Sequence, residues 1–315
     1  MNSIMVEQGE PTRLARTLDW HLQHIENYQP YFAAHHYRED KDTLAWRSKP
    51  LCELIFLVLI LHRQGLASPE FIALEQRTLR AACGFEWEAL MAEDPSSSVC
   101  VAMAMDLFAL HAVPMPGLFA QFRRARSSGY FHSVLRIPFR DMDCHYMMSK
   151  VVSGSDPAAL DAGFAMTAFG LGKNPCSYTV NDIYSLTHAL FYLTDMGAIE
   201  LDRRTLGVVD GRLQRTLMIL VTMMLRGDNN DVLGELLICI RICRLPLRGV
   251  EQRFCAAAMA KILAGMAPDG CVPSSARSID RAAGGTAKFL EVYHTTLVVS
   301  ILLGLRGEWG WTSCH

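Results

Sequence analysis

The segment TVNDIYSLTHALFYLTDMG, residues 179–197, has the pattern of one buried helix, and the rest of the chain can be interpreted from it. Asn181 or Asp182 can cap the first turn, because a short side-chain oxygen accepts a hydrogen bond from a free backbone N–H group. Gly197 stands where a left-handed cap commonly ends a helix. Between these ends, apolar residues recur at helical spacing, namely Leu186, Ala189, Leu190 and Leu193. The segment therefore predicts a helix that packs into a core.

A line of polar side chains follows the same predicted helix. Tyr184, His188 and Asp195 share one helix face, because His188 lies four residues after Tyr184 and seven before Asp195. A largely apolar helix with His and Asp along one line is either part of a buried site or a structural helix whose polar groups are paired. Both interpretations stay open at the level of this one segment.

Length, composition and charge limit the class of protein. The chain has 315 residues, of which 50% are hydrophobic and 20% charged, and its net charge is -2. These values suit one large domain or two small ones with a sizeable core, and they give no electrostatic footprint for nucleic acid. The N-terminal segment lacks the basic start and apolar run of a secretory signal. The most apolar stretch, residues 51–61, is shorter than the ~20 residues that span a bilayer. We therefore expect a cytoplasmic protein without a membrane partner.

The ten cysteines are scattered and form no CxxC pair. In a reducing compartment such residues behave as small buried hydrophobic side chains. Their spacing argues against a Cys-rich structural zinc site.

Helical periodicity occurs along almost the whole chain, and signals for β-strands are almost absent. Boundaries from such patterns hold to ~2–4 residues. We expect helices at about residues 11–27, 49–64, 69–82, 97–112, 116–127, 140–152, 157–169, 180–196, 203–226, 230–244, 248–265 and 286–305.

The expected helices are of two kinds that alternate along the chain. One kind is apolar nearly all round, which indicates burial on every side. These inner helices are 49–64, 97–112, 140–152, 180–196, 230–244 and 286–305. The other kind carries Arg, Glu and Gln on one face, as residues 69–82 do, and is typical of outer helices. The repeat of about 40–60 residues is typical of stacked helical hairpins. We expect a single all-α domain over residues 1–315, an (α/α)6 toroid, with an open α-solenoid as the alternative.

Each expected inner helix carries one ionisable residue at a similar depth. These residues are Glu53, Asp106, His145, His188, Glu235 and His294. Burying an unpaired carboxylate is costly, and the segments around Glu53 and Glu235 offer no neighbouring cation on the same helix. The carboxylates therefore need partners on other helices or a wet cavity. We predict that the six residues converge as catalytic groups, in which carboxylates raise the basicity of the histidines. A fully paired structural network is the alternative.

Four further residues are candidates for substrate binding, namely Tyr184, Asp195, Tyr293 and Thr295. Tyr184 and Tyr293 lie beside His188 and His294 and could donate protons or hydrogen bonds. A structural interpretation stands beside each candidate. Tyrosine is often buried with its hydroxyl satisfied, threonine in a helix bonds back to the preceding turn, and Asp195 could pair with an arginine at the helix end.

Two other features have competing interpretations. Asp141 and Asp143 form a DxD pair, which binds Mg²⁺ in phosphate chemistry, but their place at a helix start favours capping and the helix dipole. Residues 265–285 form the longest break in periodicity. A loop of this length is often a functional lid, and a plain surface excursion is the alternative.

The alternation of inner and outer helices resembles the α/α toroids of terpene cyclases, lanthionine cyclases and several glycan-active enzymes. The DxDD acid motif of class II terpene cyclases is matched only as DMDC at residues 141–144, and no Cys-Cys-His zinc set stands out. The phrases IYSLTHALFYLTDMG (residues 183–197) and YHTTLVVSILLG (residues 293–304) are similar to an uncharacterised family of bacterial proteins found among natural-product gene sets. This resemblance implies a bacterial cytosolic protein of specialised metabolism.

The preferred hypothesis is an enzyme that performs acid–base chemistry on a small-molecule or peptide intermediate, as a cyclase, lyase or isomerase without a cofactor. In it His188 and His294 move protons. A first alternative is a metal-dependent hydrolase, in which zinc or iron is held by His188, His294 and His145 with a carboxylate. A second alternative is a helical-repeat binding or scaffold protein. A carrier protein and a second copy of the chain are further partners to consider, and nucleic acid is not expected.

Overall fold

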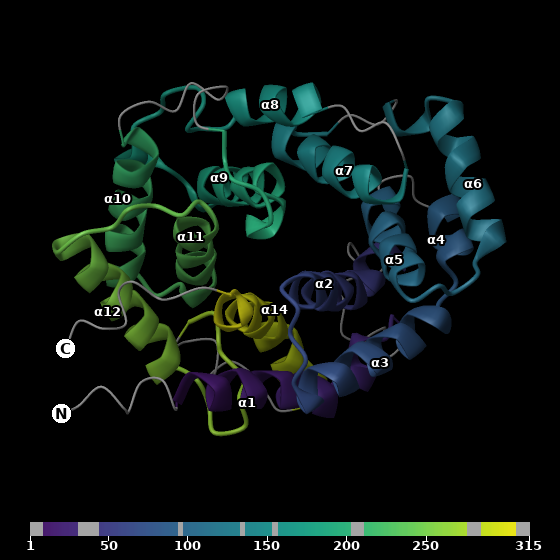
Figure 1. Cartoon of the computed structure of the whole chain (residues 1–315), viewed down its shortest axis with the longest axis horizontal. Coiled ribbons are helices and arrows are strands. Elements are labelled where there is room, and N and C mark those ends of the chain that lie inside the picture. The colour runs from purple at the N-terminus through teal and green to yellow at the C-terminus, as the bar shows by residue number, and fades with distance from the viewer. Residues whose placement is uncertain are drawn as a thin grey trace.

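The structure is a computed structural model, and it describes residues 9–30, 44–93, 97–132, 136–152, 157–202, 211–275 and 285–306. These residues form helices joined by turns and loops, with no strand among them, so the expected all-α class is confirmed (Figure 1). The six inner helices are α2 (Leu44–Arg63), α5 (Ser98–Leu110), α7 (Pro138–Val151), α9 (Val180–Leu193), α11 (Asn230–Ile242) and α14 (Gly285–Gly304). The outer helices are α1 (Gly9–Gln23), α3 (Pro69–Cys83), α4 (Trp87–Glu93), α6 (Pro116–Ser127), α8 (Pro157–Ala165), α10 (Arg212–Arg226) and α12 (Val250–Ala264).

The inner helices contact one another in a closed cycle. Each packs on the next in the order α2, α5, α7, α9, α11 and α14, and α14 returns to α2. Figure 1 shows these helices around a common centre, with the outer helices on their far side. The cyclic contacts favour the toroid over the open solenoid, and the choice between those two architectures stays a prediction.

Helix α9 begins with a capping box whose N-cap lies before the predicted Asn181 or Asp182, although Asp182 takes part in it. The N-cap is Thr179, whose hydroxyl accepts from the backbone N–H of Asp182, while the Asp182 carboxylate accepts from the Thr179 N–H at 2.7 Å. The helix ends at Leu193, three residues before the expected end, and a short 3-10 helix, η6 (Asp195–Gly197), follows it. Asp195, Met196 and Gly197 all have positive φ angles, so the chain reverses there in a left-handed turn.

Helix α2 begins five residues before the expected position 49. Lys49, which already lay within the expected helix 49–64, stands one turn before Glu53, with Nζ and Oε1 2.9 Å apart. The expectation that Glu53 has no neighbouring cation on its own helix was therefore wrong. Helix α4 was not expected at all, because its seven residues are too few for a periodic signal.

Small residues permit close approach where the cycle of inner helices closes. A Cβ atom at Gly304 of α14 would overlap the side chain of Leu61 in α2. A Cβ atom at Gly234 of α11 would lie 2.8 Å from Val298 of α14. Leu61 is fully buried, so these contacts lie within the core of the protein.

The described part of the 265–285 segment is bound to inner helices. The backbone N–H of Val272 donates to Thr296 of α14 at 3.0 Å, and the Asn230 side chain of α11 donates to the Pro273 carbonyl at 3.0 Å. Residues 276–284 lie outside the described residues. The nine cysteines of the described residues are all free, as expected. Among the described helices, none has the length and apolar character that a membrane crossing requires.

Candidate functional site

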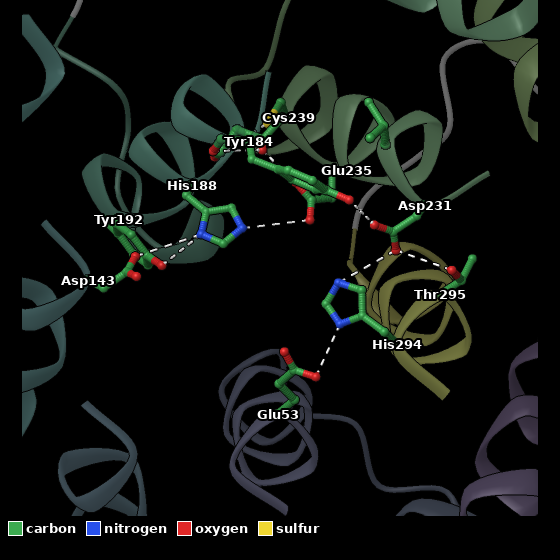
Figure 2. Close-up of polar contacts among 12 residues, drawn as sticks. Glu53, Asp143, Tyr184, His188, Tyr192, Asp231, Glu235, Cys239, His294 and Thr295 are labelled. Atoms are coloured by element: carbon green, nitrogen blue, oxygen red, sulfur yellow. Dashed lines mark hydrogen bonds and ion pairs between the residues drawn. The ribbon is translucent and has the colours of Figure 1, made fainter. Parts of the chain in front are cut away.

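A network of polar side chains lies on the inner faces of five inner helices, and we call it the central network (Figure 2). It consists of Lys49 and Glu53 of α2, Arg140 and Asp143 of α7, Tyr184, Thr187, His188 and Tyr192 of α9, Asp231 and Glu235 of α11, and His294 and Thr295 of α14. Each half of the network is centred on one histidine.

His294 lies between two carboxylates from two other helices. Its Nδ1 is 3.2 Å from Glu53 Oε2, and its Nε2 is 3.6 Å from Asp231 Oδ1. Asp231 in turn accepts from Tyr184 at 2.5 Å and from Thr295 at 3.3 Å. The two carboxylates thus hold the imidazole at both ring nitrogens, as Figure 2 shows.

His188 has the same surroundings. Its Nε2 lies 3.7 Å from Glu235 Oε1, and its Nδ1 lies 3.7 Å from Asp143 Oδ1. Thr187 donates to the second oxygen of Glu235 at 2.5 Å, and Arg140 donates to the second oxygen of Asp143 at 2.8 Å. Each carboxylate that faces His188 is thus fixed by a further donor.

The carboxylates keep both imidazoles protonated at neutral pH. Burial alone would lower the pKa of His188, but Asp143 and Glu235 outweigh it and raise that pKa from 6.5 to about 10. Burial is likewise outweighed at His294, whose pKa is raised to about 9 by the charges of Glu53 and Asp231. Both side chains are therefore imidazolium ions.

The carboxylates respond in different directions. Burial would raise the pKa of Glu53, but Lys49 and His294 hold it below its usual value. At Asp143, His188 and Arg140 outweigh burial in the same way and lower the pKa. Burial raises the pKa of Asp231, and the negative charge of Glu235 adds to that effect. Asp231 is therefore protonated more readily than an ordinary aspartate, in contrast to Glu53 and Asp143.

Solvent reaches both histidines although they lie between helices. The exposed fraction is 22% for the His188 side chain and 38% for that of His294, whereas Glu235 is 3% and Asp143 is 4% exposed. The histidines can thus meet a ligand at the surface of the network, while two of the carboxylates that face them are shielded from water.

Two residues predicted for the site belong to a second polar cluster, nearer the C-terminal ends of the inner helices. Asp106 of α5 forms an ion pair with Arg63 of α2. Asp195 accepts from Lys150 and from Tyr146, both at 2.6 Å. Asp106 therefore belongs to this second cluster and not to the central network, because its partner Arg63 is the last residue of α2, ten residues after Glu53.

Two more predicted residues also lie outside the central network. His145 of α7 has its Nε2 3.6 Å from Asp141 of the same helix, so it does not join the other histidines. Tyr293 is 6% exposed and stacks on Phe289, with ring centroids 5.1 Å apart, in an aromatic cluster that includes Tyr28. Its ring therefore packs on neighbouring aromatic side chains, as the structural interpretation expected.

The structure brings together four of the six predicted catalytic residues, Glu53, His188, Glu235 and His294, with Tyr184 and Thr295 of the predicted binding residues. Asp231 was not predicted for the site, although it lies one turn before Glu235 and shares its helix face. Asp143 was predicted to serve in helix capping, with Mg²⁺ binding as the alternative. Asp231 could have been predicted from its spacing, because it lies four residues before Glu235 and therefore on the same helix face.

Three residues of the network could hold a metal ion. Asp231, Glu235 and His294 each offer one ligand atom, and these atoms lie within 4.8 Å of one another. The predicted ligand set differs from this group, because His145 is elsewhere and His188 is not a member.

Fold and site together define an all-helical protein with an internal His–carboxylate network. The chain belongs to the family described as "Domain of unknown function (DUF6895)", whose model matches residues 14–303. No curated protein and no solved structure matches it.

Proposed function

We propose that the protein is an acid–base enzyme that acts on a small-molecule intermediate at the central network. The observation that supports this proposal most is the placement of two partly exposed imidazolium groups, each between two carboxylates from other helices. A site with a few converging polar groups in apolar surroundings is typical for small-molecule chemistry. The resemblance to proteins of natural-product gene sets favours an intermediate of bacterial specialised metabolism.

The raised pKa values of the two histidines support their role as proton donors. With pKa values raised to about 10 and about 9, His188 and His294 carry the proton at neutral pH and act as general acids. The carboxylates Glu235 and Asp231 accept protons, and Tyr184 orients Asp231 through its 2.5 Å hydrogen bond. Such a pair of acid and base serves a cyclisation, elimination or isomerisation without a cofactor.

The test compares the wild-type chain with variants in extracts of source cells from which the gene has been removed. Mass spectrometry follows which metabolites the purified protein consumes. We expect His188→Gln and His294→Gln to fold, by circular dichroism, and to lose that consumption. His62→Gln is the matched control, because His62 also pairs with a carboxylate, Glu75 at 2.6 Å, but outside the network.

Consumption that survives both network substitutions would contradict the proposal. A scaffold protein would instead show a loss of thermal stability in His188→Ala and no consumption by the wild-type chain, because a fully paired network serves to fix helix positions.

A metal-dependent hydrolase is the second candidate, favoured by the grouping of Asp231, Glu235 and His294. A zinc or iron ion held there would supply a Lewis acid and an activated water. His294 must lose its proton before it can bind a metal, so affinity should rise with pH up to about 9. Elemental analysis of protein purified without chelator tests this candidate, with Asp231→Asn as the variant that should lose the metal.

A further inference from the structure

A cavity of about 640 Å³ lies away from the central network, at the C-terminal ends of α2, α9, α11 and α14. Gln64 and Arg306 line it where α2 and α14 end, and Met196 and Gly197 line it at the left-handed turn after α9. None of the twelve residues of the central network lines this cavity. It is therefore a separate place for a ligand.

The cavity wall carries positive charge. Arg241, Arg244 and Arg306 line it, and the described lining residues include no Asp or Glu. Arg241 donates to the carbonyl of Leu305, and Arg306 donates to the carbonyl of Gly65. Both guanidinium groups are thus positioned by backbone carbonyls, which accept their hydrogen bonds without neutralising their positive charge.

Arg244 occupies a backbone position that normally favours glycine. It follows the last turn of α11 with a φ of 48°, and the next residue, Leu245, donates back to the carbonyl of Ile240. Such a left-handed residue after a helix is usually glycine, because a Cβ atom is strained there. Within the described part of the chain, the Arg244 side chain makes no hydrogen bond or ion pair that would offset this cost.

Apolar side chains also line the cavity. Ile240, Leu245 and Leu247 line it together with Met196. A guanidinium group binds phosphate and carboxylate oxygens through two parallel N–H donors, and an apolar wall favours a ligand that has a hydrocarbon part. We propose that this cavity is a binding site for an organic anion with a phosphate or carboxylate head group and an apolar body. The head group contacts Arg244, and the body lies against the apolar wall.

Isothermal titration calorimetry of the full chain tests this assignment. The probes are phenyl phosphate, benzoate and inorganic phosphate, with benzyl alcohol as the neutral analogue. We expect saturable binding of phenyl phosphate or benzoate, and the tighter of the two identifies the head group. Inorganic phosphate should bind more weakly, and benzyl alcohol should not bind.

Variants at Arg244 separate binding from folding. Arg244→Gln and Arg244→Gly should each weaken the binding of the better organic anion about tenfold, because a charge-assisted contact is lost. Arg244→Gly should also raise Tm, since glycine accepts the left-handed backbone. Arg226→Gln is the matched control, because Arg226 is an exposed arginine at the end of α10 and does not line the cavity.

The outcomes that overturn the assignment are distinct. They are the absence of saturable binding by both organic anions, equal affinity in Arg244→Gln and wild type, or equal affinity of benzyl alcohol. Equal affinity of inorganic phosphate would overturn the role of the apolar body. Binding should persist in His188→Gln, so the result does not depend on the proposed enzymatic activity.

Discussion

The rings of Tyr146 and Tyr192 stack with their centroids 4.8 Å apart, and this pair joins the two polar clusters on the inner helices. The Tyr192 hydroxyl lies 3.3 Å from His188 Nδ1, whereas the Tyr146 hydroxyl donates to Asp195. The two tyrosines thus connect the central network to the second polar cluster, which contains Arg63, Asp106, Lys150 and Asp195. Each hydroxyl can be removed without loss of the stacked rings.

We expect Tyr192→Phe to change the surroundings of His188 while the ring stack remains. The loss of one hydroxyl contact should lower the free energy of unfolding by about 1 kcal/mol, and the imidazole NMR signals of His188 should shift. Tyr146→Phe is the matched control, because its hydroxyl contacts Asp195 instead. Equal shifts of the His188 signals in both variants would contradict the assignment of Tyr192 to the central network.

The free energy of unfolding should fall as the pH rises from about 6.5 to about 10. The pKa of His188 is raised from 6.5 to about 10, so its contribution is complete below pH 6.5 and is lost as the pH approaches 10. The pKa of Asp143 is lowered from 3.8, so its contribution is present above that pH and is lost in acid. Urea denaturation across this range should show that the difference between wild type and His188→Gln shrinks with rising pH. A constant difference would mean that His188 is neutral in the folded protein.

His145→Gln should leave the central network unchanged. His145 faces Asp141, whose side chain is 54% exposed, and such a surface pair contributes little. We expect a change in the free energy of unfolding within about 0.5 kcal/mol and unaltered titration of His188 and His294 by NMR. A large shift of either titration curve would show that His145 interacts with the central network.

Gly304→Ala tests the packing that closes the cycle of inner helices. The added methyl group meets Leu61 of α2, which is fully buried, and we expect a loss of about 1–3 kcal/mol in urea denaturation. Gly84→Ala is the control, because Gly84 has a right-handed backbone and no atom nearer than 3.6 Å to the new Cβ. That variant should gain about 0.4–1 kcal/mol. A Gly304→Ala protein as stable as wild type would show that α14 and α2 can move apart.

The helical class and the six inner helices could be predicted from the sequence because they depend on local periodicity. A helix that is apolar on nearly every side, such as α11 (Asn230–Ile242), is predicted to be buried from its sequence alone. Helix ends were less predictable. The capping box of α9 depends on hydrogen bonds between Thr179 and Asp182, which periodicity does not detect, and α2 begins five residues before its predicted start.

The members of the site were only partly predictable, because they depend on how far each helix is shifted along its neighbours. Glu53, His188, Glu235 and His294 were found by their contrast with apolar surroundings. Asp106 also stands among apolar residues, but it pairs with Arg63 in the second polar cluster, nearer the C-terminal ends of the inner helices. Asp231 lies in the first turn of α11, where an acidic residue has an ordinary role with the helix dipole, so only its spacing of four residues from Glu235 distinguished it.

The contact between Glu53 and His294 spans 241 residues of the chain. At a synthesis rate of about 5–20 residues per second, α2 leaves the ribosome on the order of 10–50 seconds before α14 can meet it. During this interval the apolar inner surface of the growing chain lacks its last partner, which is the kind of surface that chaperones bind. The central network is therefore among the last features of the protein to form, and a nascent chain that stops before α14 contains no complete site.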